Sequence, residues 1–427
     1  MNKVQVVIVV VSIILAIGAV FVFTSSTSKD RQTSTGQLTV WGTLPNDSLK
    51  PTFQEYSRET KTTISYVEIS ERDFTERLLK AIATDTGPDV VIQRADWIKS
   101  NRSILSPVPS TVISVRDYQN AFVDIASAIF IEGNSIWAFP MSIDPLVLYW
   151  NKDLFNSASV PLPPKDWDEA LTVSNQLKKI GDGGVIERAG IALGRARNIP
   201  IAKDILSLLL LQLGGDIEDR AGKFLFDKQG GTDQIGAQIL KFYTDFSRGG
   251  TGAYTWNTNL PEPRDLFLQG KLGMMIDFIS YMPTVKLKNP HISYDVARPP
   301  QVAQAEFPIY YASAEGIVVP RKSKNGLAGW SFANWLTSPT AVKIHLKSRA
   351  AGPARRDLLN DAELAKNNLL PLLRELTLNS RGIHDIYSDD NTQLMREMVE
   401  GVADDRVTPS FAIGNARLKS QATREKK

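Results

Sequence analysis

Two patterns of apolar residues, short continuous runs and residues at helical spacing, alternate in the first part of the chain. Short apolar runs predict strands at 38–41, 63–69 and 89–92. Between them, apolar residues recur at helical spacing over 49–60 and 74–82, which predicts two helices that each bury one face. Strand and helix therefore alternate, and this order favours a mostly parallel, doubly wound α/β sheet.

A second α/β block is predicted over 144–311. Its first strand is the unbroken apolar run 146–150, which is typical of a strand buried on both faces. Asp166 and Glu169 then have the spacing of a capping box, and they predict a helix that ends before Gly181. The block has the same strand-and-helix character as the first, so we expect it to form a second α/β unit.

Polar and aromatic residues follow two of the predicted strands at their carboxyl ends, where doubly wound sheets bind ligands. Trp41 and Thr43 come after the first strand, and Arg94, Asp96 and Trp97 come after the third. Arg94 and Asp96 offer a donor fork and an acceptor close together, which suits a ligand rich in hydroxyl groups. Both indoles also have an alternative role in packing. Trp41 could cover the edge of the sheet, and Trp97 could pack under the helix that follows it.

Composition narrows the class of protein. A chain of 427 residues is too long for one hydrophobic core, so we expect two domains. The net charge of +3 is nearly balanced, and we predict no nucleic-acid partner. The absence of cysteine excludes disulfides, thiolate metal sites, a cysteine nucleophile and a lipid anchor attached to cysteine. The basic segment 411–427 is interpreted as a solvated tail.

The chain begins with a long apolar run. Residues 4–23 are almost entirely apolar and follow Lys3, and about 20 apolar residues suffice to span a bilayer as a helix. The run lacks a convincing cleavage site, so we favour an uncleaved transmembrane anchor at 1–23 over a removed signal peptide. The Ser/Thr-rich segment 24–36 predicts a flexible tether. The folded body would then lie outside the cytoplasmic membrane, at the cell surface or in the periplasm.

No catalytic or metal-binding pattern is found in the sequence. His291, His345 and His384 are far apart and show no metal-ligand spacing. The nucleophile elbow, the phosphate-binding loop and the dinucleotide fingerprint are all missing. The adjacent pair Asp389 and Asp390 is interpreted as a solvated loop, with a weaker alternative as a calcium site. We therefore predict no enzyme activity, no cofactor and no metal.

Several spaced motifs agree in order and spacing with one known family. They are TGPDVV at 86–91, the segment AFPMSIDPLVLYWNKDLFNSASVPLPPKDWDEAL at 138–171, LFLQGKLGMM at 266–275, the segment 311–320, and GPAR at 352–355. Over roughly 37–360 the chain resembles the extracellular solute-binding proteins of sugar ABC transporters, whose maltose-binding-protein-like members have two lobes.

The resemblance implies a type II periplasmic-binding-protein-like fold, with two doubly wound α/β lobes joined by a hinge. One lobe would comprise 37–143 and 312–349, and the other 144–311 and 350–410. The chain would cross between the lobes three times. Closure around a ligand would then be a hinge-type domain motion.

The resemblance also implies that residues of the second lobe and of the crossings face the cleft. These candidates are Asp144, Trp256, Asp277, Tyr281, Tyr311, Ser313 and Arg355. Trp256 is the favoured ligand platform, because its Gly-rich and polar neighbours give no core pattern, and aromatic rings suit the apolar face of a sugar. For Asp144, a hydrogen bond at the hinge is as good an interpretation as a ligand contact. For Arg355, a solvated or inter-lobe position is favoured over a ligand contact.

The resemblance implies a transport receptor. Such a protein captures a sugar or oligosaccharide between its lobes and delivers it unchanged to the permease subunits of an ABC transporter, here while held at the membrane by the N-terminal helix. Two alternatives stay open at this point. One is a ligand-binding sensor module that signals to a partner, and the other is a membrane-anchored glycan hydrolase with a carboxylate pair.

Overall fold

The computed structural model of the protein describes residues 36–219, 221–228, 234–383 and 385–424. The predicted anchor at 1–23, nearly all of the predicted tether and His384 lie outside these residues. Among the described helices, none combines the length and the apolar character needed to cross a membrane.

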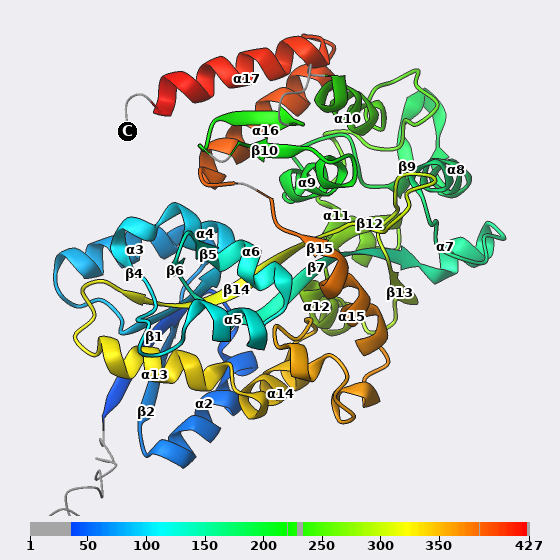
Figure 1. Cartoon of the computed structure of the whole chain (residues 1–427). Helices are drawn as coiled ribbons and strands as arrows, with labels where there is room; N and C mark the ends of the chain where they lie inside the picture. The colour runs from blue at the N-terminus through cyan, green and yellow to red at the C-terminus, as the bar shows by residue number, and fades with distance from the viewer. Residues whose placement is uncertain (1–35, 220, 229–233, 384, 425–427) are drawn as a thin grey trace, which may run out of the picture.

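One mixed sheet runs through the molecule, with strand order β2-β1-β3-β14-β7-β12-β9-β8 (Figure 1). The strands of this path are β1 (Gln37–Gly42), β2 (Thr63–Glu68), β3 (Val90–Arg94), β7 (Phe139–Asn151), β8 (Lys179–Ile180), β9 (Ile186–Ile191), β12 (Leu272–Phe278) and β14 (Tyr310–Pro320). Three more strands pair at its sides: β4 (Leu105–Ser106), β13 (Tyr294–Ala297) and β15 (Ser380–Arg381). Two short hairpins, β5 (Ile131–Glu132) with β6 (Ser135–Ile136) and β10 (Asp216–Glu218) with β11 (Phe224–Asp227), lie outside this sheet.

Helices cover the sheet at both ends. The helices near β1–β3 are α2 (Asn46–Thr60), α3 (Glu71–Ala83), α4 (Ala95–Ser100), α5 (Val115–Ala121), α6 (Asp124–Phe130), α13 (Gly326–Leu336) and α14 (Pro339–Ser348). The others are α7 (Lys152–Ser157), α8 (Trp167–Leu177), α9 (Ala202–Gln212), α10 (Gln234–Asp245), α11 (Pro263–Leu268), α12 (Met282–Lys288), α15 (Leu370–Asn379), α16 (Ser388–Ala403) and α17 (Pro409–Arg424).

The predicted strand and helix order of the first part is confirmed. The three predicted strands form β1, β2 and β3, and β1 pairs in parallel with both of its neighbours. The two predicted helices form α2 and α3, and the Ser70 hydroxyl caps α3 by accepting from the Asp73 backbone N–H. The predicted helix after Asp166 is α8, and the Asp166 carboxylate accepts from the Glu169 N–H at 2.8 Å.

Two long strands connect the two ends of the sheet. The first half of β7 pairs antiparallel with β14, and its second half, from Leu146 to Trp150, pairs with β12. Buried apolar residues fall into two large clusters, and the boundary lies between Ile143 and Leu146 on β7 and between Tyr311 and Ala312 on β14. We call the part around the cluster that contains Ile143 lobe 1, and the part around the cluster that contains Leu146 lobe 2.

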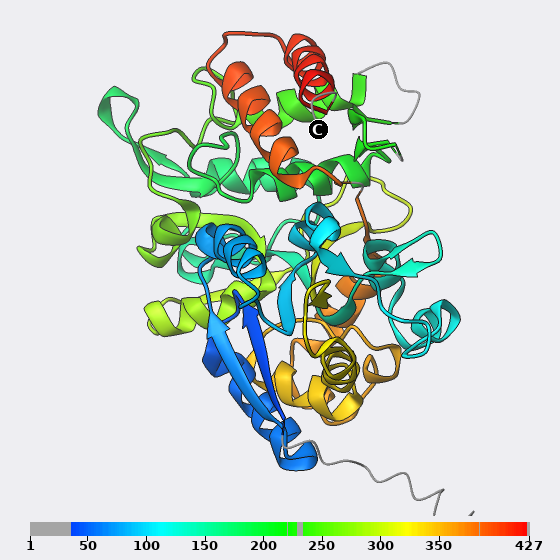
Figure 2. The ribbon, with the colours of Figure 1, turned by 90° about the vertical axis from the view of Figure 1, so that its left-hand side faces the viewer.

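Figure 2 shows the two lobes one above the other, with the blue N-terminal strands in the lower part and the red C-terminal helices in the upper part. After β14 and its helices, Ala350 packs on the lobe 2 cluster, Ala354 and Leu359 belong to the lobe 1 cluster, and Leu373 belongs to the lobe 2 cluster, so this part of the chain contacts both lobes. The division into lobes that move about a hinge stays a prediction.

The C-terminal segment corrects two expectations. Residues predicted as a solvated tail belong to α17, which packs on lobe 2 through Ile413 and its neighbours. Arg417 donates to the Leu225 carbonyl at 3.1 Å, and Arg424 forms an ion pair at 2.5 Å with Glu218, which is fully buried. Asp389 and Asp390, predicted as a loop, lie in the first turn of α16, where acidic side chains stabilise a helix.

Candidate functional site

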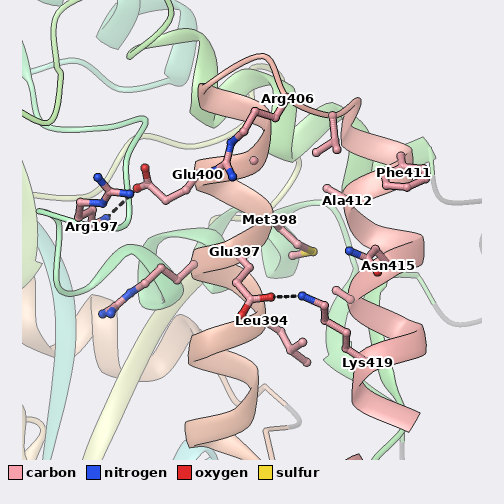
Figure 3. Close-up of a pocket in the computed structure, with 14 residues that line it drawn as sticks. Arg197, Leu394, Glu397, Met398, Glu400, Arg406, Phe411, Ala412, Asn415 and Lys419 are labelled. Carbon is pink, nitrogen blue, oxygen red and sulfur yellow. Dashed lines mark hydrogen bonds and ion pairs between the residues drawn. The ribbon is translucent and has the colours of Figure 1, made fainter. Parts of the chain in front are cut away.

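Two cavities differ sharply in where they lie. The larger one, about 410 Å³, is a groove between α16 and α17, entirely within lobe 2. Figure 3 shows Lys419 of α17 reaching Glu397 of α16, with Phe411 farther along the same groove. The smaller one, about 220 Å³, lies between the lobes and takes residues from both of them and from both crossing strands. A protein that binds by closing two lobes needs the second arrangement, so we assign the candidate site to the inter-lobe cavity.

Lobe 1 contributes loops at the carboxyl ends of its parallel strands. Because β1 and β3 are neighbours, Thr43 and Arg94 meet at one edge of the sheet and both line the inter-lobe cavity. The Thr43 hydroxyl donates to the side-chain oxygen of Gln93 at 3.3 Å. Glu71, the first residue of α3, also lines the cavity and is exposed.

Arg94 is held by groups of both lobes. Its guanidinium lies 3.6 Å from the Asp96 carboxylate and 3.8 Å from the carboxylate of Asp204 on α9. It also stacks over the Phe278 ring of lobe 2 at 4.6 Å. Burial works against the charge of Arg94, but the two carboxylates outweigh it and raise its pKa. Burial raises the pKa of Asp204 in spite of Arg94.

The crossing strands carry a buried cluster of charges on the cavity floor. Glu315 on β14 forms an ion pair with Arg349, and Asp144 on β7 lies 3.9 Å from the same guanidinium. Asp144 accepts from the Ser280 N–H at 3.1 Å, and Glu315 accepts from the Ser142 hydroxyl at 3.0 Å. Burial raises the pKa of Asp144 to about 6, against the opposing effect of Arg349.

Lobe 2 contributes an arginine that lies on an aromatic ring. Arg264 on α11 binds the buried Asp277 carboxylate through two hydrogen bonds of 2.6 and 2.8 Å. Its guanidinium lies over the Tyr281 ring at 4.3 Å. The buried Tyr281 hydroxyl has no hydrogen-bond partner in the described part of the chain. A buried polar group of this kind is costly unless a ligand or water satisfies it.

A smaller pocket of about 30 Å³ adjoins the inter-lobe cavity. Ser313 on β14 lines both of them. The smaller pocket also contains two residues predicted from the sequence, Asp96 and Tyr311. Burial raises the pKa of the Tyr311 hydroxyl, and Asp204 raises it further. Of the predicted ligand residues, the structure therefore brings together Thr43, Arg94, Asp96, Asp144, Tyr281, Tyr311 and Ser313, with Asp277 behind Arg264.

Trp256, the favoured platform, is not part of either inter-lobe pocket, and that expectation is corrected. Its side chain is fully buried in the lobe 2 cluster, and its indole N–H lies 3.2 Å from the side-chain oxygen of Asn198. The backbone N–H groups of Thr255 and Trp256 both donate to the Phe246 carbonyl, which fixes this segment against the end of α10. Polar neighbours in the sequence therefore gave no information about exposure.

Three further predicted residues also lie outside the two pockets. Trp41 packs half-buried on the lobe 1 cluster, near Arg77. The Trp97 indole N–H donates to the Thr75 hydroxyl at 2.8 Å, as its packing alternative expected. Arg355 pairs with Asp357 at 2.8 Å and donates to a lobe 1 carbonyl.

Three charged residues of the site, Arg264, Glu315 and Arg349, were not predicted from the sequence. Arg264 and Arg349 belong to no motif. Each is held in the site by a carboxylate from another element, Asp277 for Arg264 and Glu315 for Arg349. Glu315 did carry a signal, since it is a lone carboxylate within the mostly apolar segment 314–320. Among the described residues, no group of His, Asp or Glu is arranged to hold a metal ion.

A cavity between two α/β lobes that are joined by long crossing strands defines a two-lobed binding protein. Residues 42–343 match the family described as bacterial extracellular solute-binding protein, and the chain belongs to this family. The family predicted from the sequence motifs is therefore confirmed.

Individual relatives are distant. A putative binding protein of Brucella abortus is 22% identical over 264 residues, and the match spans 61% of each chain. A galactooligosaccharide-binding protein of Bacillus subtilis is 22% identical over 80% of this chain and 78% of that one. The solved ABC substrate-binding protein of Listeria monocytogenes, in complex with cycloalternan, has a TM-score of 0.75 and 17% identity, over 91% of this chain and 99% of that one. The predicted α/β fold of this class is thus confirmed.

Proposed function

We propose that this protein captures a sugar or oligosaccharide in the inter-lobe cavity and delivers it unchanged to an ABC permease. The observation that carries the proposal is the cavity itself, which combines hydroxyl, carboxylate, guanidinium and aromatic groups from both lobes. Paired donors and acceptors suit the hydroxyl groups of a sugar, and rings suit its C–H face. The names of the Bacillus and Listeria proteins, which refer to a galactooligosaccharide and to cycloalternan, support the carbohydrate class.

Ligand binding would favour the closed state because the ligand contacts both lobes only there. Arg94 and Thr43 come from lobe 1, whereas Arg264 and Tyr281 come from lobe 2. A ligand shifts a conformational equilibrium only by its differential affinity for the two states. The permease would then recognise the closed arrangement of the lobes, and the protein would undergo a hinge-type motion.

The N-terminal segment 1–23 would hold the body at the outer face of the cytoplasmic membrane. This part of the proposal rests on the apolar run and on the family, whose members are extracellular. The mass of the protein extracted from membranes checks it. An intact N-terminus supports the anchor, and a mass that lacks the apolar run contradicts it.

A saccharide panel tests the central proposal. Binding of the right saccharide should raise the melting temperature and reduce the radius of gyration in solution scattering, while chromatography of the mixture shows the sugar unchanged. A shift with a released product would instead favour the hydrolase alternative. If a broad panel of mono- and oligosaccharides produces no shift, the carbohydrate assignment is wrong.

A further inference from the structure

Three arginines line the inter-lobe cavity, and every one of them is already matched by carboxylates. Arg264 is held through two hydrogen bonds, and Arg94 and Arg349 each lie within 4 Å of two carboxylates. The partners are Asp96 and Asp204 for Arg94, Asp277 for Arg264, and Asp144 and Glu315 for Arg349. An acidic ligand would have to displace these carboxylates, several of which are buried and cannot move into water.

Carboxylates also outnumber cations around the two adjoining pockets. The cations are Arg94, Lys99, Lys203, Arg264 and Arg349. The carboxylates that line the pockets or pair with these cations are Glu71, Asp96, Asp144, Asp204, Asp277, Glu315 and Asp385. The excess of negative charge lies in a partly buried site, where charges are screened less than at an open surface.

Glu71 differs from the other carboxylates. It lines the cavity from the start of α3 and is exposed. Among the described residues, Arg94 of the same cavity is close enough for Glu71 to help raise its pKa, but the two do not form an ion pair. The other lining carboxylates, Asp144 and Glu315, are buried and engaged with Arg349. Glu71 is thus free to meet a positive charge on a ligand.

We propose that the cavity selects a saccharide that carries a protonated amino group, with Glu71 as the partner of the ammonium, and rejects acidic saccharides. This inference rests on the proposed function and names the charge class of its ligand.

A charge series of saccharides tests the inference. The probes are a glucosamine oligosaccharide, its N-acetylated form and a hexuronic acid oligosaccharide of equal length, each titrated by calorimetry at a pH that keeps the amine protonated. The aminated probe should bind about threefold or more tightly than the N-acetylated one, because only the aminated probe can form an ion pair with Glu71. Added salt should reduce this advantage, and the acidic probe should not bind measurably.

Three variants separate the role of Glu71 from general effects of charge. Glu71→Gln should lower the affinity for the aminated probe about threefold, toward that of the N-acetylated probe. The matched control is Glu76→Gln on the same helix, whose side chain is 82% exposed and faces Lys80, and it should leave all affinities unchanged. Asp277→Asn should release Arg264 and raise the affinity for the acidic probe.

The outcomes distinguish the inference from the proposed function. Equal binding of the aminated and N-acetylated probes, or binding of the acidic probe by the unmodified protein, would overturn the inference while the proposed function stands. The same holds if a neutral saccharide outside the series binds and the aminated probe does not. Failure of every saccharide would overturn the proposed function and the inference with it.

Discussion

The inter-lobe cavity and the groove between α16 and α17 differ in how they carry charge. The groove is the larger, but its ion pair between Lys419 and Glu397 leaves 51% and 42% of the side chains exposed. In the cavity, the side chains of Arg349 and Glu315 are only 13% and 5% exposed. Burial of an ion pair carries a desolvation cost that an exposed pair does not have. The groove also contains one buried carboxylate, Glu400, which pairs with Arg195 at 3.0 Å. The cavity differs because its buried pair joins Arg349 to a crossing strand between the lobes.

The two regions also differ in how the chain builds them. The groove comes almost entirely from the contiguous segment 394–419, with Arg197 as its one distant member. The cavity joins segments from the start of lobe 1, from both crossing strands and from lobe 2. Only the second construction couples occupancy to the relative position of the lobes.

The largest effect is expected from breaking the buried charge cluster. Arg349→Met leaves Glu315 and Asp144 buried without a cation, and removal of one partner of a buried pair costs about 3–5 kcal/mol. Denaturant unfolding measures the free energy of unfolding. A loss below about 1 kcal/mol would show that the cluster is as solvated as the groove, contrary to the comparison.

The pH dependence of stability tests the burial of the Asp144 carboxyl group in the same charge cluster. Its pKa is raised by burial to about 6, so the protonated form favours the folded state. Asp144 therefore contributes stability below about pH 4 that is lost as the pH rises through about 6, on the order of 2–3 kcal/mol. His345, whose pKa is lowered by burial to about 3, changes stability in the opposite direction.

Asp144→Asn isolates the carboxyl group, because His345 contributes equally to both proteins. The melting temperature of the wild type should fall relative to the variant as the pH rises from about 4 to about 6. The amide oxygen of the substituted side chain can still accept from the Ser280 N–H, so this hydrogen bond is kept. Parallel melting curves over this range would contradict the assignment.

A smaller effect is expected on ligand binding. Tyr281→Leu removes the ring that faces the cavity and should weaken binding of the transported saccharide about three- to tenfold. Arg197→Ala, in the groove, should leave the affinity unchanged. Calorimetry compares the two variants, and the reverse result would place the ligand in the groove.

The smallest effect is expected from the exposed pair of the groove. Lys419→Met removes its ion pair with Glu397 and should change the free energy of unfolding by about 1 kcal/mol or less. The same denaturant series as for Arg349→Met measures it, so the two variants form a matched pair. A loss as large as that of Arg349→Met would remove the distinction between the two regions.

Local patterns predicted much of the fold. The strands of lobe 1 and the capped helix after Asp166 follow from short-range periodicity and side-chain caps, which the sequence displays directly. The first residues of the site, Thr43 and Arg94, follow from the rule that strand ends gather at one sheet edge.

The rest depends on tertiary contacts that no local pattern shows. The Trp256 indole is buried because a loop turns inward, although its neighbours are glycine and polar residues. Arg349 becomes a site residue only because β14 brings Glu315 beside it. The prediction of a solvated tail was wrong for the same reason, because Arg424 forms an ion pair with Glu218 of a hairpin that is distant in the sequence.

A crystal structure of the protein purified with its natural solute tests the central claim most directly. We expect density for a saccharide between the lobes, in contact with Asp144, Ser313 and Tyr281. Density in the groove between α16 and α17, together with an empty inter-lobe cavity, would contradict the account.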